Sequence, residues 1–182
     1  MEPTRHAVAY TDGANSVAKS PSAAAAVVLH VPQTDDHPDF VLEWGRFLGT
    51  EWTNAVAELA GMEMALEAHA KLCPESPLEV YTDSRYVQGV LTRKLDGWAW
   101  KAKKNKALIE RIRERLPRWF QIKWVRGHDG DFWNDRADAI AKMCKHTKSG
   151  WRVQYGAGDR PPVIPMDVKN YHTYKKAKSL RP

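Results

Sequence analysis

The sequence predicts an α/β fold: a mixed five-stranded sheet with helices packed on it, in the order β-β-β-α-β-α-(α)-β-α. Two observations lead to this prediction. Three strand-like segments at the start of the chain are separated by short polar stretches, which is typical of an antiparallel meander. From residue 53 onward helical and strand-like segments alternate, which is typical of parallel strands added beside the first. With 182 residues, we expect one domain over 1–147 and a basic, flexible C-terminal extension over 148–182.

The first three predicted strands lie before residue 50. Residues 5–12 alternate between polar and apolar side chains and end at Gly13. Residues 22–31 (SAAAAVVLHV) form a second apolar segment, although its alanine run alone would also allow a helix. Residues 40–49 follow the polar turn QTDDHPD, so we expect them to form a hairpin with the second strand.

A helix is predicted next, running to about Leu72. Thr53 or Asn54 can cap it, and its apolar residues recur every three or four positions. Residues 78–82 then form a short buried strand, and Ser84 can cap the helix that follows.

Two further helices and one strand complete the predicted domain. Helical periodicity over about 105–116 ends at Pro117, and residues 119–126 form the last predicted strand. The final helix covers about 133–147. From Ser149 onward the pattern fades, and the sequence GAGDRPPVIP is typical of a linker.

The positive charge of the chain is confined to two segments. Residues 93–126 contain 12 Lys and Arg against 3 Asp and Glu, and residues 142–182 contain 10 against 2. The rest of the chain contains 6 against 17, so the net charge of +6 is a small difference between large opposing contributions. Basic segments favour a polyanionic partner, although solvated helix faces would give the same composition.

Composition argues against several other classes of protein. No apolar run approaches the ~20 residues of a membrane helix, and the N-terminus lacks the basic and apolar regions of a signal peptide. Cys73 and Cys144 form no CxxC pair, which argues against a disulfide scaffold or a zinc finger. We therefore expect a monomer in the reducing cytoplasm, with no membrane partner.

Carboxylates close two of the predicted strands. The tripeptide Tyr-Thr-Asp occurs at 10–12 and again at 81–83, each time at the end of a strand. If these strands are adjacent and parallel, Asp12 and Asp83 lie side by side, where they repel each other unless a cation lies between them. A single Asp there would simply start a turn or cap a helix, but the repetition favours a metal site.

Further carboxylates lie on the predicted helices. Glu58 is in the first turns of the helix that begins near Thr53, where it could also be a favourable charge near a helix N-terminus. In the region of the last helix, spacing alone leaves four candidates open: Asp129, Asp131, Asp135 and Asp138.

Four motifs follow one another along the chain: Tyr-Thr-Asp-Gly (10–13), Thr-Asn-…-Glu-Leu (53–59), Tyr-Thr-Asp-Ser (81–84) and Gly-His-…-Asn-Asp-Arg-Ala-Asp (127–138). On these motifs the chain resembles type 1 ribonuclease H, of the RNase H-like nuclease superfamily, over about residues 5–146. The resemblance implies an RNase H-like fold. It also implies four metal-binding carboxylates: Asp12, Glu58, Asp83 and Asp138. Such oxygen ligands suit two Mg²⁺ ions, for which Mn²⁺ can substitute.

The resemblance implies a hydrolase, an endonuclease that cuts the RNA strand of an RNA·DNA hybrid. Two-metal-ion phosphodiester hydrolysis would leave a 5′-phosphate and a 3′-hydroxyl, with His128 as a proton shuttle. The alternatives are an RNase H-like nuclease with relaxed or different polynucleotide specificity, and a non-catalytic nucleic-acid-binding domain. The presence of all four carboxylates and His128 argues against the second of these.

Substrate contacts are also implied by the resemblance. Thr53 matches a position that holds a DNA-strand phosphate, and Asn54 one that touches the minor groove. The segment GWAWKAKKNK (97–106) places tryptophans among lysines, which is typical of a nucleic-acid-binding handle or of a solvated face with two core tryptophans. The predicted substrate-binding residues are Gly13, Thr53, Asn54, Ser84, Trp98, Trp100, Lys101, Lys103 and Lys104.

The chain departs from the family pattern at three places. Residues 14–21 (ANSVAKSP) replace a glycine-rich turn, and Asn15 or Lys19 could substitute for a phosphate-contacting Asn expected there. Ala55 replaces the second Asn of Thr-Asn-Asn, and Arg85 replaces the usual Gln after Asp-Ser. We expect these changes to leave the chemistry intact and to affect the strictness of hybrid recognition.

Overall fold

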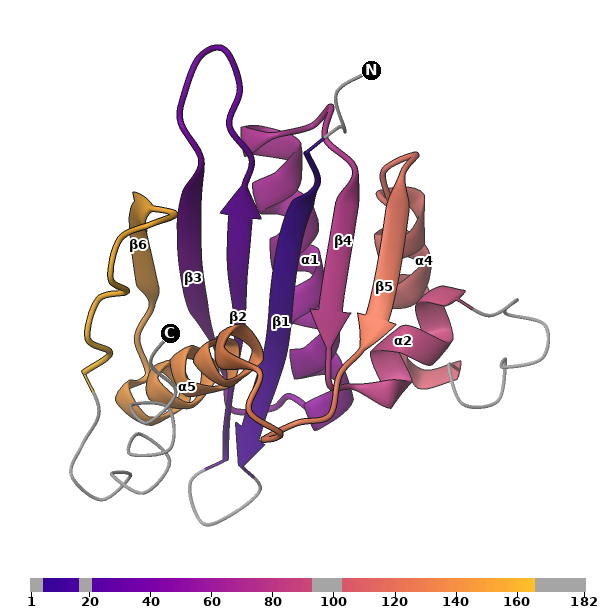
Figure 1. Ribbon diagram of the computed structural model, residues 1–182. Helices are drawn as coiled ribbons and strands as arrows, with labels where there is room; N and C mark the ends of the chain where they lie inside the picture. Colours follow the sequence, from indigo (N-terminus) through magenta and orange to yellow (C-terminus); the bar gives the residue numbers. More distant parts are fainter. Residues whose placement is uncertain (1–4, 17–20, 93–102, 166–182) are drawn as a thin grey trace.

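The computed structural model describes residues 5–16, 21–92 and 103–165. These residues form one mixed sheet with helices on both faces (Figure 1), so the predicted α/β architecture is confirmed. The sheet order is β5-β4-β1-β2-β3-β6, with six strands where five were predicted. The strands are β1 (Ala7–Ser16), β2 (Ser22–Val31), β3 (Phe40–Gly49), β4 (Leu78–Thr82), β5 (Phe120–Trp124) and β6 (Trp151–Gly156).

The strand directions agree with the prediction of an antiparallel meander followed by parallel strands. β1, β2 and β3 pair antiparallel, whereas β4 is parallel to β1 and β5 is parallel to β4. The two Tyr-Thr-Asp copies lie in register, with Tyr10 opposite Tyr81 and Thr11 opposite Thr82. Their tyrosine rings stack with centroids 5.1 Å apart. The register therefore brings both copies to the same edge of the sheet.

β2 is the strand whose sequence also allowed a helix. Every residue of it except His30 is buried, because helices cover both faces of the sheet at this strand. A strand buried on both sides has no polar face, so it appears in the sequence as a continuous apolar run. Its alanines let the helices on the two faces approach the sheet closely.

The helices are divided between the two faces of the sheet (Figure 1). One face carries α1 (Asn54–Leu72), α2 (Arg85–Thr92) and α4 (Lys106–Glu114), with a 3₁₀ turn at Lys103–Asn105; the other carries α5 (Phe132–Thr147). The Thr53 hydroxyl caps α1 by accepting a hydrogen bond from the Val56 amide at 3.3 Å. The Asp131 carboxylate caps α5 by accepting from two backbone amides. Among the described residues, no helix combines the length and apolar character needed to cross a bilayer.

The sheet separates two hydrophobic cores. The larger lies under α1, α2 and α4 and includes Leu59, Met62 and Ile112. The smaller lies under α5 and includes Val28, Ile140 and Ile164. Cys73 belongs to the first core and Cys144 to the second, and both thiols are free. The two thiols are thus buried in separate cores on opposite faces of the sheet.

The sixth strand corrects the sequence prediction. β6 lies inside the segment interpreted as a linker and extension, and it pairs antiparallel with β3. Its sequence, WRVQYG, alternates half-buried with exposed residues, which is the pattern of an edge strand with one covered face. The pattern was missed because it is short and follows a helix directly. The first part of the predicted extension is thus built into the sheet, and residues 166–182 lie outside the described residues.

Candidate active site

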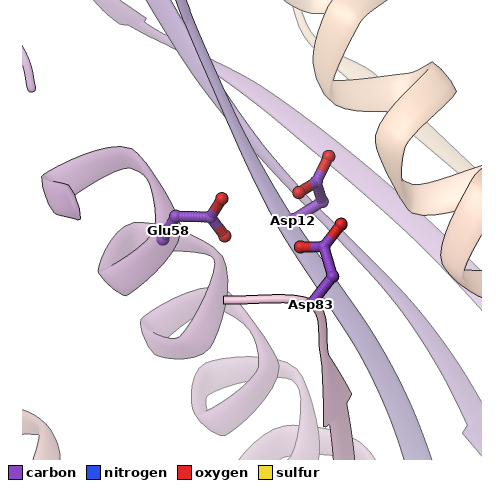
Figure 2. Close-up of side chains that lie close together, drawn as sticks. All are labelled: Asp12, Glu58 and Asp83. Atoms are coloured by element: carbon purple, nitrogen blue, oxygen red, sulfur yellow. The ribbon is translucent and has the colours of Figure 1, made fainter. Parts of the chain in front are cut away.

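Three carboxylates converge at the carboxyl end of β4 and the middle of β1, because β1 continues past the predicted strand end to Ser16 (Figure 2). Asp12 lies on β1, Asp83 follows β4 directly and Glu58 lies on α1, and their side chains point toward one another. Each offers an oxygen atom, and these atoms all lie within 4.8 Å of one another. Parallel pairing of β1 with β4 brings the two aspartates together, as the repeated tripeptide predicted.

Two glycines allow α1 to lie close enough to β1 for Glu58 to join the aspartates. A Cβ atom at Gly13 would be 2.3 Å from the backbone nitrogen of Glu58, and one at Gly61 would be 2.9 Å from the carbonyl oxygen of Asp12. Any side chain at either position would push α1 away from the strand. Gly13, predicted to bind substrate, therefore also sets the spacing of the carboxylate cluster.

Asp138 approaches the cluster from α5, on the opposite face of the sheet. Its negative charge helps to raise the pKa values of Asp12, Glu58 and Asp83. Its Oδ2 accepts a hydrogen bond from Lys142 Nζ at 2.7 Å and lies 4.0 Å from His128 Nδ1. Of the alternatives that spacing left open, Asp131 is occupied as the cap of α5.

The electrostatics of the cluster are those of a cation site. Burial, followed by the charges of Glu58, Asp138 and Asp83, raises the pKa of Asp12 well above its usual range. Burial and the charge of Asp83 raise the pKa of Glu58 to about 8. Burial and Asp138 also raise the pKa of Asp83. Crowded carboxylates of this kind either retain protons or bind a cation.

The donor atoms fit a hard divalent cation. Glu58 Oε2 is buried and has no hydrogen-bond partner among the described residues, so it is available as a ligand. The cluster offers carboxylate oxygens only, which suits Mg²⁺ or Mn²⁺ and disfavours zinc.

His128 lies on the loop between β5 and α5, next to Asp138. Its side chain is 56% exposed and its backbone is left-handed, with φ of 59°. The adjacent Gly127 is required for space, because a Cβ there would be 2.6 Å from Asp83 Oδ2. The loop thus holds an exposed imidazole at the edge of the carboxylate cluster.

Some residues that support the cluster were missed from the sequence. Asn134 is 1% exposed, donates a side-chain hydrogen bond to Asp83, and has an Oδ1 without a partner among the described residues. The available signal was its position, since it shares the inward face of the last helix with Ala137 and Ala141. Trp124 Nε1 donates to the Asp83 carbonyl oxygen at 2.9 Å, and the Arg85 guanidinium stacks 3.6 Å above the Trp124 ring.

The predicted substrate-binding residues near the cluster begin helices. Thr53 caps α1, and the exposed Asn54 donates a side-chain hydrogen bond to Glu58. The Ser84 hydroxyl accepts from the Val87 amide at 3.2 Å at the start of α2. Asn15 Nδ2 donates to the Trp52 carbonyl at 2.9 Å, so that amide is engaged within the protein.

The predicted handle is described only in part. Lys103 begins the 3₁₀ turn, and Lys104 is exposed and lines a groove of about 680 Å³ between β3, α1 and α4. Trp98, Trp100 and Lys101 lie outside the described residues, as does Lys19. The groove walls also carry Arg111, which is paired with Glu63 at 2.9 Å.

Two comparisons of the sequence with known proteins find the same family. The sequence profile of the RNase H family matches residues 4–145. Ribonuclease H from Phenylobacterium zucineum (strain HLK1) is 33% identical over 165 residues, covering 85% of this chain and 99% of that protein.

Solved structures are similar as well. LC9-RNase H1, a type 1 RNase H with the type 2 active-site motif, superposes with a TM-score of 0.70 at 20% identity, covering 85% of this chain and 79% of that one. The foamy viral protease-reverse transcriptase in complex with RNA/DNA hybrid gives a TM-score of 0.61 at 25% identity, covering 81% of this chain and 21% of the viral chain.

Proposed function

Because the chain belongs to the RNase H family and is a ribonuclease H, we propose that it hydrolyses the RNA strand of RNA·DNA hybrids with the help of two divalent cations. The products would be a 5′-phosphate and a 3′-hydroxyl. The observation that carries this proposal is the convergence of Asp12, Glu58 and Asp83, with their oxygens within 4.8 Å. A hybrid substrate is supported by the foamy viral relative, whose structure contains an RNA/DNA hybrid.

The carboxylates divide between two faces of the sheet. Asp12, Glu58 and Asp83 would hold Mg²⁺, and Asp138 would contribute from α5. When bound, the ions supply the positive charge that activates a water molecule and stabilises the departing 3′ oxygen. The protein contributes a buried, preorganised set of oxygens whose mutual repulsion favours cations.

Other residues of the chain handle the proton and the substrate. His128 is exposed and adjacent to Asp138, so in this proposal it carries protons between the site and bulk water. Asn134 holds the Asp83 carboxylate through a hydrogen bond. Gly13 and Ser84 directly follow Asp12 and Asp83, and Thr53 and Asn54 begin the helix that carries Glu58. In this proposal these four residues meet the two strands of the hybrid.

The basic segments would hold the phosphate backbone on either side of the acidic cluster. In this proposal residues 97–106 supply the handle, where tryptophans would stack and lysines would contribute charge. The predicted handle contacts are Trp98, Trp100, Lys101, Lys103 and Lys104.

A second candidate is an RNase H-like nuclease with relaxed polynucleotide specificity. It is favoured by Asn15, whose side-chain amide uses one of its two N–H donors on the Trp52 carbonyl. It is also favoured by Arg85, whose charge can attract any phosphate backbone. The monomeric state and the cytoplasmic location stay predictions from the sequence.

The experiment that separates these functions compares three labelled duplexes in Mg²⁺: an RNA·DNA hybrid, a DNA duplex and an RNA duplex. Cleavage of the hybrid's RNA strand alone is the expected result. Cleavage of all three would favour the relaxed nuclease, and no hybrid cleavage in Mg²⁺ or Mn²⁺ would contradict the proposal.

The metal site itself is tested by Asp83→Asn. This change removes a ligand without altering the basic segments, so we expect cleavage to be lost while hybrid binding, measured by filter retention, persists. Exposed Glu67→Gln is the control and should leave cleavage unchanged. Full activity in Asp83→Asn would refute the assignment of the carboxylates.

A further inference from the structure

A second buried carboxylate lies outside the catalytic cluster. Glu43, in the middle of β3, is fully buried. Arg136 on α5 donates to both of its oxygens, through Nε and Nη2. Trp151 Nε1 donates at 2.9 Å and the Tyr155 hydroxyl at 2.8 Å. A buried charge is costly unless it is paired and hydrogen-bonded, and here four donor contacts satisfy it.

The donors to Glu43 come from two elements, α5 and the segment that follows it. We call residues 151–164 the C-terminal strap. Trp151 and Tyr155 stand on its strand, β6, and the Pro162 carbonyl accepts a hydrogen bond from Arg136 Nη2 at 2.6 Å. At its end Ile164, 4% exposed, packs into the core beneath α5. The strap therefore holds Glu43 through the β6 side chains and Arg136 through the Pro162 carbonyl.

Arg136 is two residues before Asp138 on the same helix. Successive helical residues are rotated by about 100°, so the two side chains leave α5 on nearly opposite sides. Arg136 reaches β3, whereas Asp138 lies beside the carboxylates of β1 and β4. Fixing Arg136 therefore fixes the rotation of α5 about its axis. A side-chain end about 5–6 Å from the axis moves about 1 Å for a rotation of ~10°.

We propose that the Glu43–Arg136 pair, held by the C-terminal strap, positions Asp138 against Asp12 and Asp83 and so sets the metal affinity of the cluster. Arg136 is a positioning residue in this proposal, since it touches no predicted ligand. The proposal rests on the proposed function, because it assumes that Asp138 helps to bind metal. Loss of such an outer partner typically weakens metal binding by about 10–100-fold.

The test uses the full chain and measures Mn²⁺ binding by calorimetry, without substrate, beside thermal unfolding. Arg136→Met should weaken Mn²⁺ binding about tenfold or more. Arg136→Lys, which keeps the charge but loses the two-pronged contact, should recover part of the affinity. Hybrid binding in EDTA should stay unchanged in both variants, because the basic segments are intact.

The control must lose stability without touching α5. Ile112→Ala serves this purpose, because Ile112 is fully buried in the core on the opposite face of the sheet. It should unfold at lower temperature and bind Mn²⁺ normally. If the Arg136 variants behave in the same way, the pair is only structural and the proposal is overturned.

Milder variants keep the proposal testable if Arg136→Met does not fold. Tyr155→Phe removes one hydrogen bond to Glu43 and retains the ring, whereas Trp151→Phe removes one and leaves a smaller aromatic side chain. Both should weaken Mn²⁺ binding in the same direction by a smaller factor, and normal binding in both would overturn the proposal. Hybrid cleavage by the unaltered chain tests the proposed function separately, since the positioning proposal depends on the ratio of Mn²⁺ affinities between chains.

Discussion

Glu58 and the two aspartates beside it make the folded chain sensitive to pH when no metal is bound. The folded pKa of Glu58 is about 8, against an ordinary value of 4.5. As pH rises between these values the unfolded chain releases its proton first, so the free energy of unfolding falls. Each unit of pKa difference corresponds to about 1.4 kcal/mol.

We therefore predict that in EDTA the melting temperature decreases from pH 5 to pH 8. Adding Mg²⁺ should raise it, more at pH 8 than at pH 5, because the ions bind the ionised carboxylates. Differential scanning calorimetry with and without Mg²⁺ measures both effects. Metal-free stability that increases over this pH range would contradict the assignment of raised pKa values.

Asp12→Asn separates the proposed catalytic role of Asp12 from its effect on the stability of the protein. The change removes a buried charge that repels Glu58, Asp138 and Asp83. We expect the metal-free protein to become more stable at pH 8, by about 1 kcal/mol or more, and hybrid cleavage to be lost. Glu67→Gln, at an exposed ion pair with Lys71, should give no such gain in urea unfolding. A destabilised Asp12→Asn protein would show that repulsion is not the dominant interaction.

At the scale of the elements, much of the fold could be predicted because periodicity and local end signals agree. Residues 22–31, 40–49 and 78–82 form strands with the predicted bounds, since covered faces and polar turns mark them directly. β6 could not be placed, because its partner is β3, more than 100 residues earlier in the chain, and nothing local specifies that pairing.

In the candidate site, too, local patterns could be predicted from the sequence and contacts between distant residues could not. Asp12 and Asp83 could be paired from the repeated tripeptide, because strand register follows from local pattern. Choosing Asp138 among its neighbours needed the family resemblance, since helix rotation is set by distant contacts such as Arg136 with Glu43. Asn134 and Trp124 could not be assigned to Asp83 for the same reason: their contacts depend on how whole elements pack.

The approach of α1 to β1 gives a prediction at this scale. Gly13→Ala should destabilise the protein by about 1–3 kcal/mol and weaken metal binding, because its methyl group meets the backbone of Glu58. Gly158→Ala is the matched control, with nothing within 4 Å of the added methyl group, and should be neutral. Chemical denaturation and Mn²⁺ calorimetry measure the two effects. An equal loss in both variants would mean that close packing at Gly13 is not the cause.

At the scale of the whole molecule, the two halves of the C-terminal segment should behave differently. Deleting 149–182 removes β6 and two of the donors to Glu43, Trp151 and Tyr155, so we expect loss of cooperative unfolding. Deleting only 166–182 removes five Lys and Arg and leaves the strap in place. That variant should fold and cleave, with weaker hybrid binding and a shallower dependence on salt.

Circular dichroism and binding titrations at several salt concentrations measure these outcomes. A cooperative fold after deletion of 149–182 would show that β6 is dispensable. An unchanged salt dependence after deletion of 166–182 would show that the last residues do not contact the substrate.

The alanines of β2 have a consequence for which mutations the enzyme tolerates. Glu58 reaches the cluster from one face of the sheet and Asp138 from the other, so the thickness of the sheet at β2 separates the two helices that carry them. Ala24 and Ala26 lie under α5, while Ala25 lies on the side of α1. Replacing any of them with valine would move a catalytic helix outward without touching a polar atom. An Ala→Val change in β2 adds only two methyl groups. We therefore expect such a change to reduce activity, although β2 carries none of the proposed catalytic residues.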